Sequence, residues 1–154
     1  MRSLPIPFHG LALEVFRCNG ALIAAGDAVV APLGLTSARW QVLGAIVESR
    51  GELSVASIAR NTGLVRQSVQ RVVNDLVTLE LVRLTPNPHH RRAQLVKLNP
   101  EGERRFETAS TWWLAHTKTL VANMPTERIT DVIAVLGTVR DRLGELAIAE
   151  VPPS

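Results

Sequence analysis

The chain has 154 residues, a length typical of one domain that buries a hydrophobic core without disulfides or metal ions. Hydrophobic residues make up 46% of the chain and charged residues 20%, which excludes an intrinsically disordered protein. The net charge of +3 is uneven, because residues 60–105 hold nine basic and only four acidic residues. This excess in the middle of the chain is typical of a protein that binds a polyanion.

The sequence predicts neither a membrane protein nor a secreted one. The longest apolar stretch, residues 21–35, is interrupted by Asp27, Pro32 and Gly34, and the first ten residues lack the pattern of a signal peptide. Cys18 is the only cysteine, so no disulfide can form within the chain. We therefore expect a cytoplasmic protein that does not contact a membrane.

Residues 1–8 contain two prolines and predict an extended arm. Apolar spacing predicts a helix over about residues 9–30. Thr36 is a suitable N-cap for the next helix, in which Leu35 is placed to pack on Trp40 as a hydrophobic staple. We expect Gly51 to close that helix.

Two further helices follow, joined by a short turn. Ser54 is the expected N-cap of a helix over residues 55–62, which Gly63 ends. The three-residue turn 63–65 leads into a second helix, predicted within residues 66–81. Two helices joined by so short a glycine-containing turn form a helix-turn-helix.

The second of these helices has one apolar and one polar face. The polar residues in question are Arg66, Gln67, Ser68, Gln70, Arg71 and Asn74. Solvated helix faces usually mix both charges, yet the first two turns here carry no carboxylate. Because arginine pairs with guanine and glutamine with adenine in the major groove, we interpret this helix as a recognition helix for double-stranded DNA. The alternative is an ordinary solvated face.

Two short apolar runs, residues 81–85 and 94–98, flank the segment PNPHHRRA and predict a β-hairpin. A basic hairpin directly after a helix-turn-helix is a wing. The loop residues His89, His90, Arg91 and Arg92 either insert into the minor groove or form an ordinary exposed loop. Adjacent histidines without cysteine or acidic neighbours do not predict a metal site, and we expect no cofactor.

The last part of the chain predicts two long helices. Asn99 and Pro100 are suited to the cap and first position of a helix that extends to about Asn123, and Pro125 opens a last helix. The final residues, VPPS, are expected to fray. The apolar faces of the terminal helices exceed what the helix-turn-helix can cover, so we expect a homodimer. A two-fold dimer places two recognition helices for major grooves about 34 Å apart and for a palindromic site.

These elements predict a mainly α fold with a small β-hairpin wing, namely a winged helix-turn-helix with N- and C-terminal dimerisation helices. Its three parts are residues 1–34, an arm and dimerisation helix; residues 35–98, the winged helix-turn-helix; and residues 99–154, the C-terminal dimerisation helices. We expect them to form one continuous domain.

Between Leu35 and Gly102 the segments LTSARWQVL, SVASIARNTGLVRQSVQRVVNDL and LVRLTPNPHHRRAQLVKLNPEG resemble the MarR family of winged helix-turn-helix regulators. The resemblance implies a homodimer held by the terminal helices, wings in the minor groove and often a small-molecule pocket between the two regions. It also implies roles for several residues, with Arg66, Gln67, Ser68, Gln70 and Arg71 at bases and phosphates and with Arg91 and Arg92 in the wing.

The chain departs from the family pattern in three places. Val65 occupies the position where a capping serine is common. Glu80 replaces a glycine that often precedes the first wing strand, and the wing has Asn87 and His90 where an acidic residue is usual. The usual Asp-Arg brace of the wing is therefore not expected.

Trp40, Trp112, Trp113 and His116 are candidates to line an effector pocket, although tryptophans at helical spacing more often belong to a core or a dimer interface. Cys18 invites comparison with peroxide-sensing members of the family, whose thiolate is assisted by tyrosines. Because this chain has no tyrosine, we interpret Cys18 as a core residue. No constellation of catalytic residues stands out.

The sequence thus predicts a dimeric, sequence-specific DNA-binding regulator, which represses palindromic promoter sites and is released by a small-molecule effector. Two alternatives remain. One is a winged-helix module that binds proteins and not DNA, and the other is a thiol-based regulator that senses oxidants through Cys18.

Overall fold

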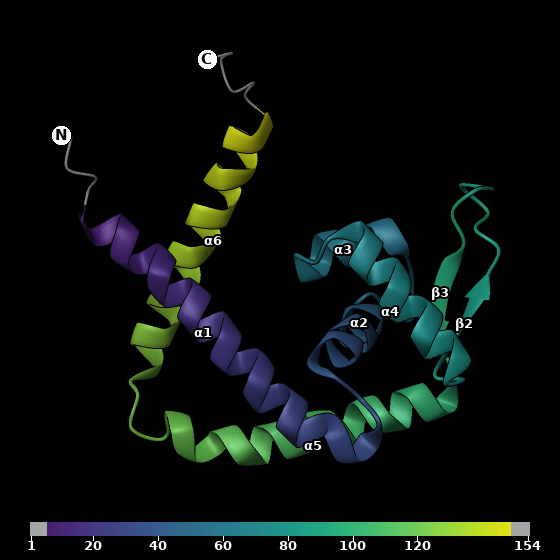
Figure 1. Ribbon diagram of the computed structural model, residues 1–154, viewed down its shortest axis with the longest axis horizontal. Coiled ribbons are helices and arrows are strands. Elements are labelled where there is room, and N and C mark those ends of the chain that lie inside the picture. The colour runs from purple at the N-terminus through teal and green to yellow at the C-terminus, as the bar shows by residue number, and fades with distance from the viewer. Residues whose placement is uncertain (1–5, 149–154) are drawn as a thin grey trace. The chain divides into compact units, whose positions relative to one another are not determined.

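The computed structural model describes residues 6–148, in which six α-helices accompany a three-stranded sheet (Figure 1). The elements in chain order are α1 (Ile6–Val30), the 3-10 turn η1 (Ala31–Leu33), α2 (Ser37–Glu48), β1 (Glu52–Ser54), α3 (Val55–Thr62), α4 (Arg66–Thr78), β2 (Val82–Thr85), β3 (Leu95–Leu98), α5 (Pro100–Val121) and α6 (Thr126–Ile148). Contacts divide the chain into two compact units, residues 1–115 and 116–154.

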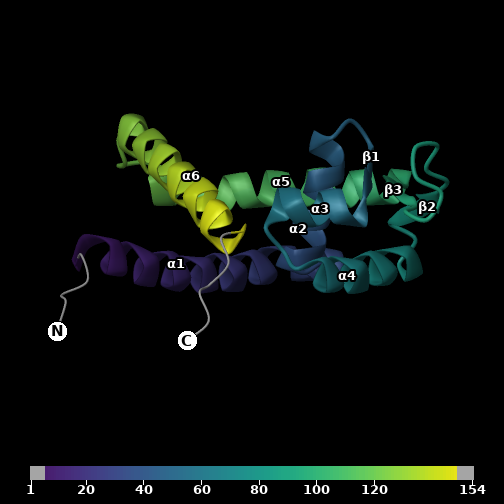
Figure 2. The same cartoon turned by 90° about the horizontal axis from the view of Figure 1, so that it is seen from above.

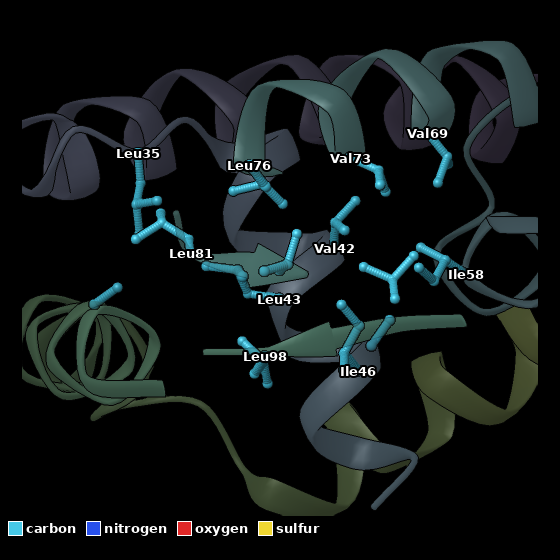
Figure 3. Close-up of a cluster of buried hydrophobic side chains, with 14 of the residues drawn as sticks. Leu35, Val42, Leu43, Ile46, Ile58, Val69, Val73, Leu76, Leu81 and Leu98 are labelled. Atoms are coloured by element: carbon cyan, nitrogen blue, oxygen red, sulfur yellow. The ribbon is translucent and has the colours of Figure 1, made fainter. Parts of the chain in front are cut away.

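The hydrophobic core of the first unit lies where α2, α3, α4 and the sheet meet (Figure 3). Its fully buried side chains include Val42, Leu43, Ile46, Ile58, Val69, Val73, Leu76, Leu81 and Val96. The contributions of α2 and α4 recur at intervals of three and four residues, which is the spacing of one helix face. Burial of this face of α4 leaves its polar face directed toward solvent.

The sheet has the strand order β1-β3-β2, with both pairs antiparallel. The predicted hairpin is confirmed to within one residue at each strand, whereas β1 was not predicted. Val96 of β3 lies opposite Leu53 on one side and Leu84 on the other. A three-residue strand has too few positions to show an alternating pattern, so its pairing with β3 depends on the tertiary fold.

Three of the predicted helix boundaries around the helix-turn-helix are confirmed. Thr36 accepts a hydrogen bond from the Arg39 amide at 3.2 Å, and Ser54 accepts one from the Ser57 amide at 3.2 Å. Gly63 follows α3 in the left-handed conformation, with φ of 71°, which glycine adopts at little cost. Gly63 thus ends α3 at the start of the turn that leads into α4.

Other boundaries differ from the prediction. The extended arm expected over residues 1–8 is wrong for Ile6–Phe8, which form the first turn of α1; Pro7 is tolerated there because the first helical amides have no partner in the helix. Residues 1–5 of that arm and the VPPS tail lie outside the described residues. Helix α2 ends at Glu48, before the expected closing residue Gly51. Arg50, which directly precedes Gly51, has a φ of 69°.

The first turn of α2 is fastened to the end of α1. The Ser37 amide donates to Asp27 Oδ1 at 2.6 Å, and the Ser37 hydroxyl donates to the Ile23 carbonyl at 2.9 Å. Gly26 lies directly against the Ser37 hydroxyl, where a Cβ atom would leave no room. On the same turn of α2, Arg39 forms an ion pair with Asp75 of α4 at 3.1 Å.

Helix α4 ends at Thr78, earlier than the predicted stretch, in a Schellman turn. The Leu81 amide donates to Leu76 O at 2.9 Å and the Glu80 amide to Val77 O at 3.0 Å. Glu80 adopts φ of 57°, the conformation for which glycine is usual. The Glu80 carbonyl accepts from Asn99 Nδ2 at 2.8 Å, which joins the end of α4 to the start of α5.

Among the described residues, no single helix is long and apolar enough to cross a membrane. Residues 7–33 and 37–48 satisfy the length and composition criteria only as a pair, and that pair is bent by 82°.

Replacing Glu80 tests the strain at the end of α4. We expect Glu80→Gly to be more stable than Glu80→Ala by about 1 kcal/mol, because only glycine adopts the left-handed conformation without steric cost. Urea unfolding of both variants measures the difference. As a control, glycine in place of Glu107, inside α5, should destabilise the protein relative to alanine at that position. Equal stabilities of the two Glu80 variants would contradict this account.

A charge cluster fixes the first turn of α5. Glu101 accepts two hydrogen bonds from Arg104, at 2.7 and 2.8 Å, and one from Arg105 at 2.7 Å. Arg105 also donates to the Leu33 carbonyl of η1 at 3.1 Å. Hydrogen bonds from Arg104, and then from Arg105, lower the pKa of Glu101 to about 2.

This lowered pKa predicts a pH-dependent contribution to stability. Because the pKa of Glu101 is about 2 in the fold against an ordinary value of 4.5, its contribution is present above pH 4.5 and is lost as the pH falls toward 2. The free energy of unfolding should therefore fall less steeply with acid in Glu101→Gln than in the unmodified protein. Urea unfolding between pH 5 and pH 2 provides the measurement. Glu107→Gln, on the same helix, should keep the full acid sensitivity.

Candidate nucleic-acid interface

The polar face of α4 is exposed along its whole length. All six predicted residues, Arg66, Gln67, Ser68, Gln70, Arg71 and Asn74, are exposed, whereas Val69, Val73 and Leu76 on the other face are buried. Gln70 Nε2 donates to Asn74 Oδ1 at 3.0 Å, which holds two side chains side by side. Within residues 6–148, neither Arg66 nor Arg71 forms a hydrogen bond or an ion pair through its side chain, so both guanidinium groups remain available to an anion.

The start of α4 lacks a capping side chain, as predicted. Val65 is the N-cap residue and makes no side-chain hydrogen bond to the helix. The first turn contains no acidic residue, so the amides and the positive end of the helix dipole are uncompensated by the helix itself. The one carboxylate of α4, Asp75, lies in the third turn and is paired with Arg39. The beginning of α4 is therefore the more electropositive end.

The wing lies beside α4 in Figure 1, and an Asx turn orders its loop. The His89 amide donates to Asn87 Oδ1 at 3.0 Å, and the His90 amide donates to Asn87 O at 3.3 Å. Asn87 thus supplies an acceptor without a negative charge. His89, His90, Arg91 and Arg92 are all exposed. Since residues 81–100 contain no acidic residue, the wing is purely basic.

Arg83 has a structural role that the sequence did not indicate. Its Nη1 donates to the Leu98 carbonyl and to Asn99 Oδ1, both at 2.8 Å. These bonds join β2 to the end of β3 and to the start of α5. From the sequence, Arg83 is only one of the residues that make up the basic excess. A side chain that reaches from one strand to the next cannot be recognised from spacing alone.

A hollow of about 380 Å³ lies between α2, the end of α3 and α5. It is lined by Trp40, Gln41, Gly44, Ala45, Glu48, Asn61, Thr62, Phe106 and Ser110. Four of these, residues 41, 44, 45 and 48, follow the spacing of one face of α2, which is a signal that the sequence contained. Glu48 is the only charged residue in the lining.

Of the four residues proposed for an effector pocket, Trp40 lines this hollow. Trp113 packs edge-on against Trp40, with ring centroids 5.6 Å apart, and Trp40 Nε1 donates to Ser110 Oγ at 3.4 Å. Trp112 is 41% exposed, and His116 is exposed in the second unit. The structure therefore brings Trp113 against Trp40, but it places none of Trp112, Trp113 and His116 in the lining.

The terminal helices expose large apolar side chains. Phe16 of α1 is 74% exposed, Leu120 of α5 is 67% exposed, and Ile133 of α6 is 66% exposed. The interpretation of Cys18 as a core residue is wrong for the single chain, because Cys18 is exposed on α1. Apolar faces of this extent are typical of surfaces that a partner covers.

Comparisons with known proteins agree with this architecture. A family model described as MarR family matches residues 33–93. An uncharacterized protein of Mycobacterium tuberculosis is 37% identical over 141 residues, which cover 90% of this chain and 91% of that protein. The two chains are thus similar over nearly their full lengths.

Solved structures share the fold. A MarR family transcriptional regulator from Streptomyces coelicolor is 27% identical, with a TM-score of 0.75 over 91% of this chain and 97% of that chain. A mutant of MarR from E. coli, complexed with operator DNA, is 20% identical, with a TM-score of 0.75 over 89% of this chain and 98% of that chain.

The predicted fold, a mainly α winged helix-turn-helix, is confirmed by these structures and by the elements described above. The family model spans the helix-turn-helix and most of the wing, which are the segments on which the resemblance depended. The chain therefore belongs to the MarR family of transcriptional regulators.

Proposed function

We propose that this protein is a homodimeric regulator that binds specific sites in double-stranded DNA and represses transcription from palindromic promoter sites. The observation that carries the proposal is the exposed face of α4, where Arg66 and Arg71 have no side-chain partner within the described part of the chain and no acidic residue lies in the first turn. The complex of the E. coli relative with operator DNA supports it. Action on DNA places the protein in the cytoplasm.

In this proposal the N-terminal half of α4 enters the major groove. Arg66 and Arg71 pair with guanine edges or phosphates, and Gln67 and Gln70 are suited to adenine edges. Ser68 and Asn74 add polar contacts along the same face. The wing carries Arg91 and Arg92, directly preceded by His89 and His90, toward the adjacent minor groove, where the negative potential attracts arginine.

A dimer accounts for the exposed apolar faces of α1, α5 and α6. These helices carry some of the most exposed large hydrophobic residues of the described chain, and a second copy would cover equivalent faces in both protomers. Two copies of α4 related by a two-fold axis read two half-sites of a palindrome. Single modules lack the affinity and the site length that such a pair provides.

The hollow beside Trp40 is where a small molecule would relieve repression. It reaches Asn61 and Thr62 in the last turn of α3, directly before the turn that leads to α4. A ligand held there would displace α3 and, with it, the recognition helix. Since the aromatic lining includes Glu48 and no basic residue, it favours neutral or cationic aromatic compounds over anionic ones.

Replacing Arg71 tests the DNA interface. We expect Arg71→Ala to weaken binding to a selected duplex at least about tenfold, the value of one lost charged contact of about 1.4 kcal/mol, and to leave the dimer intact. The dependence of log K on log[salt] should also become shallower if Arg71 contacts phosphate. Arg128→Ala, an exposed arginine on α6, serves as the control and should bind as the unmodified protein does. Absent or salt-independent duplex binding would support a protein-binding module instead.

Replacing Ile133 tests the dimer. Ile133→Glu introduces a charge into the apolar face of α6, so we expect sedimentation to show monomers at concentrations where the unmodified protein is dimeric. Thr130→Glu lies on the same helix at an exposed polar position and should leave the dimer unchanged. A monomeric unmodified protein would overturn the proposed assembly.

A further inference from the structure

Val65 is an apolar side chain on an otherwise polar and basic surface. It is 71% exposed and directly precedes Arg66 and Gln67, which begin the exposed face of α4. Its neighbour Leu64 packs against the hydrophobic core. The turn between α3 and α4 therefore directs one apolar side chain inward and the next one outward.

The fold gains little burial and no capping hydrogen bond from the Val65 side chain. In the same chain, Thr36 and Ser54 cap α2 and α3 through side-chain oxygens, whereas the N-cap position of α4 has no such bond. A serine or threonine there would stabilise the helix, and its absence lowers stability. The valine is thus unfavourable for the isolated protein, both as a cap and as an exposed hydrophobe.

The location of Val65 suggests the group that would cover it. A recognition helix contacts base edges mainly through its N-terminal residues. In the proposed complex the N-cap side chain would therefore lie at the floor of the major groove, beside Arg66 and Gln67. On that floor the apolar group presented by a base is the 5-methyl of thymine. The branched valine side chain has few rotamers to lose when it packs against a methyl group.

We propose that Val65 reads thymine, by apolar contact with the 5-methyl group of one thymine in each half-site. This inference rests on the proposed DNA binding by α4. It assigns sequence selection to a residue with no polar atoms in its side chain, and it makes the missing cap of α4 part of the site.

The experiment replaces single methyl groups in DNA. A bound duplex is first selected from a random pool, and each thymine of a half-site is then changed to deoxyuridine, symmetrically and one position at a time. Deoxyuridine pairs as thymine does and lacks only the 5-methyl. At one position we expect the Kd of the unmodified protein to rise about fourfold per half-site, which is the contribution of one buried methyl-sized group.

Two variants make the test specific. Val65→Ser should bind the thymine and deoxyuridine duplexes equally at that position, and it should also melt at a higher temperature because serine caps α4. The higher melting temperature establishes that the variant is folded. Val77→Ala removes another partly exposed valine, near the far end of the same helix, and should retain the full fourfold difference.

Each outcome decides a separate point. The proposed contact of Val65 with thymine is wrong if a duplex is selected but no thymine shows the methyl effect. It is also wrong if Val65→Ser still shows that effect. In both cases the proposed function stands. If no duplex is bound at low salt, both the proposed function and this inference are wrong. Loss of the methyl effect in Val65→Ser alone, with Val77→Ala unchanged, supports the contact.

Discussion

The packing of α4 on α2 determines everything that the outer surface of α4 can do. Val69, Val73 and Leu76 are fully buried in the cluster that α2 supplies with Val42, Leu43 and Ile46 (Figure 3). Burial of each such side chain contributes about 1.5–3 kcal/mol, so rotation of α4 about its axis by even one residue would cost several of these contributions. The orientation of the polar face is therefore a consequence of the core.

A group of polar contacts, here called the polar junction, fixes the position of the wing relative to α4. Glu80 turns the chain out of the helix, Asn99 binds the Glu80 carbonyl, and Arg83 binds both Asn99 and the last residue of β3. Gly102 completes the junction, because a side chain at that position would collide with the Leu81 carbonyl. Wing and helix are thus connected by directional bonds and close packing. Figure 2 shows β2 and β3 beside the end of α4.

The sequence predicted the elements whose signals are local. Thr36, Ser54 and Gly63 carry their capping chemistry in their own side chains or in the lack of one, and the α4 stripe repeats at the period of a helix. The features that it missed depend on partners far along the chain. Strand β1 forms by pairing with β3, and Arg83 donates a hydrogen bond to Asn99, sixteen residues away. The hollow beside Trp40 is lined in part by Phe106 from α5. Periodicity contains no information about such pairs, whereas the departures at Val65 and Glu80 did indicate places where the structure is unusual.

The bonds at the first turn of α2 join it to two other helices. Ser37 ties that turn to Asp27 and to the Ile23 carbonyl of α1, and Arg39 ties the same turn to Asp75 of α4. Three helices are therefore coupled within one turn of α2, close to the point where α1 ends. The first turn of α2 is thus the point at which bonds from α1, a helix of 25 residues, and from α4 converge.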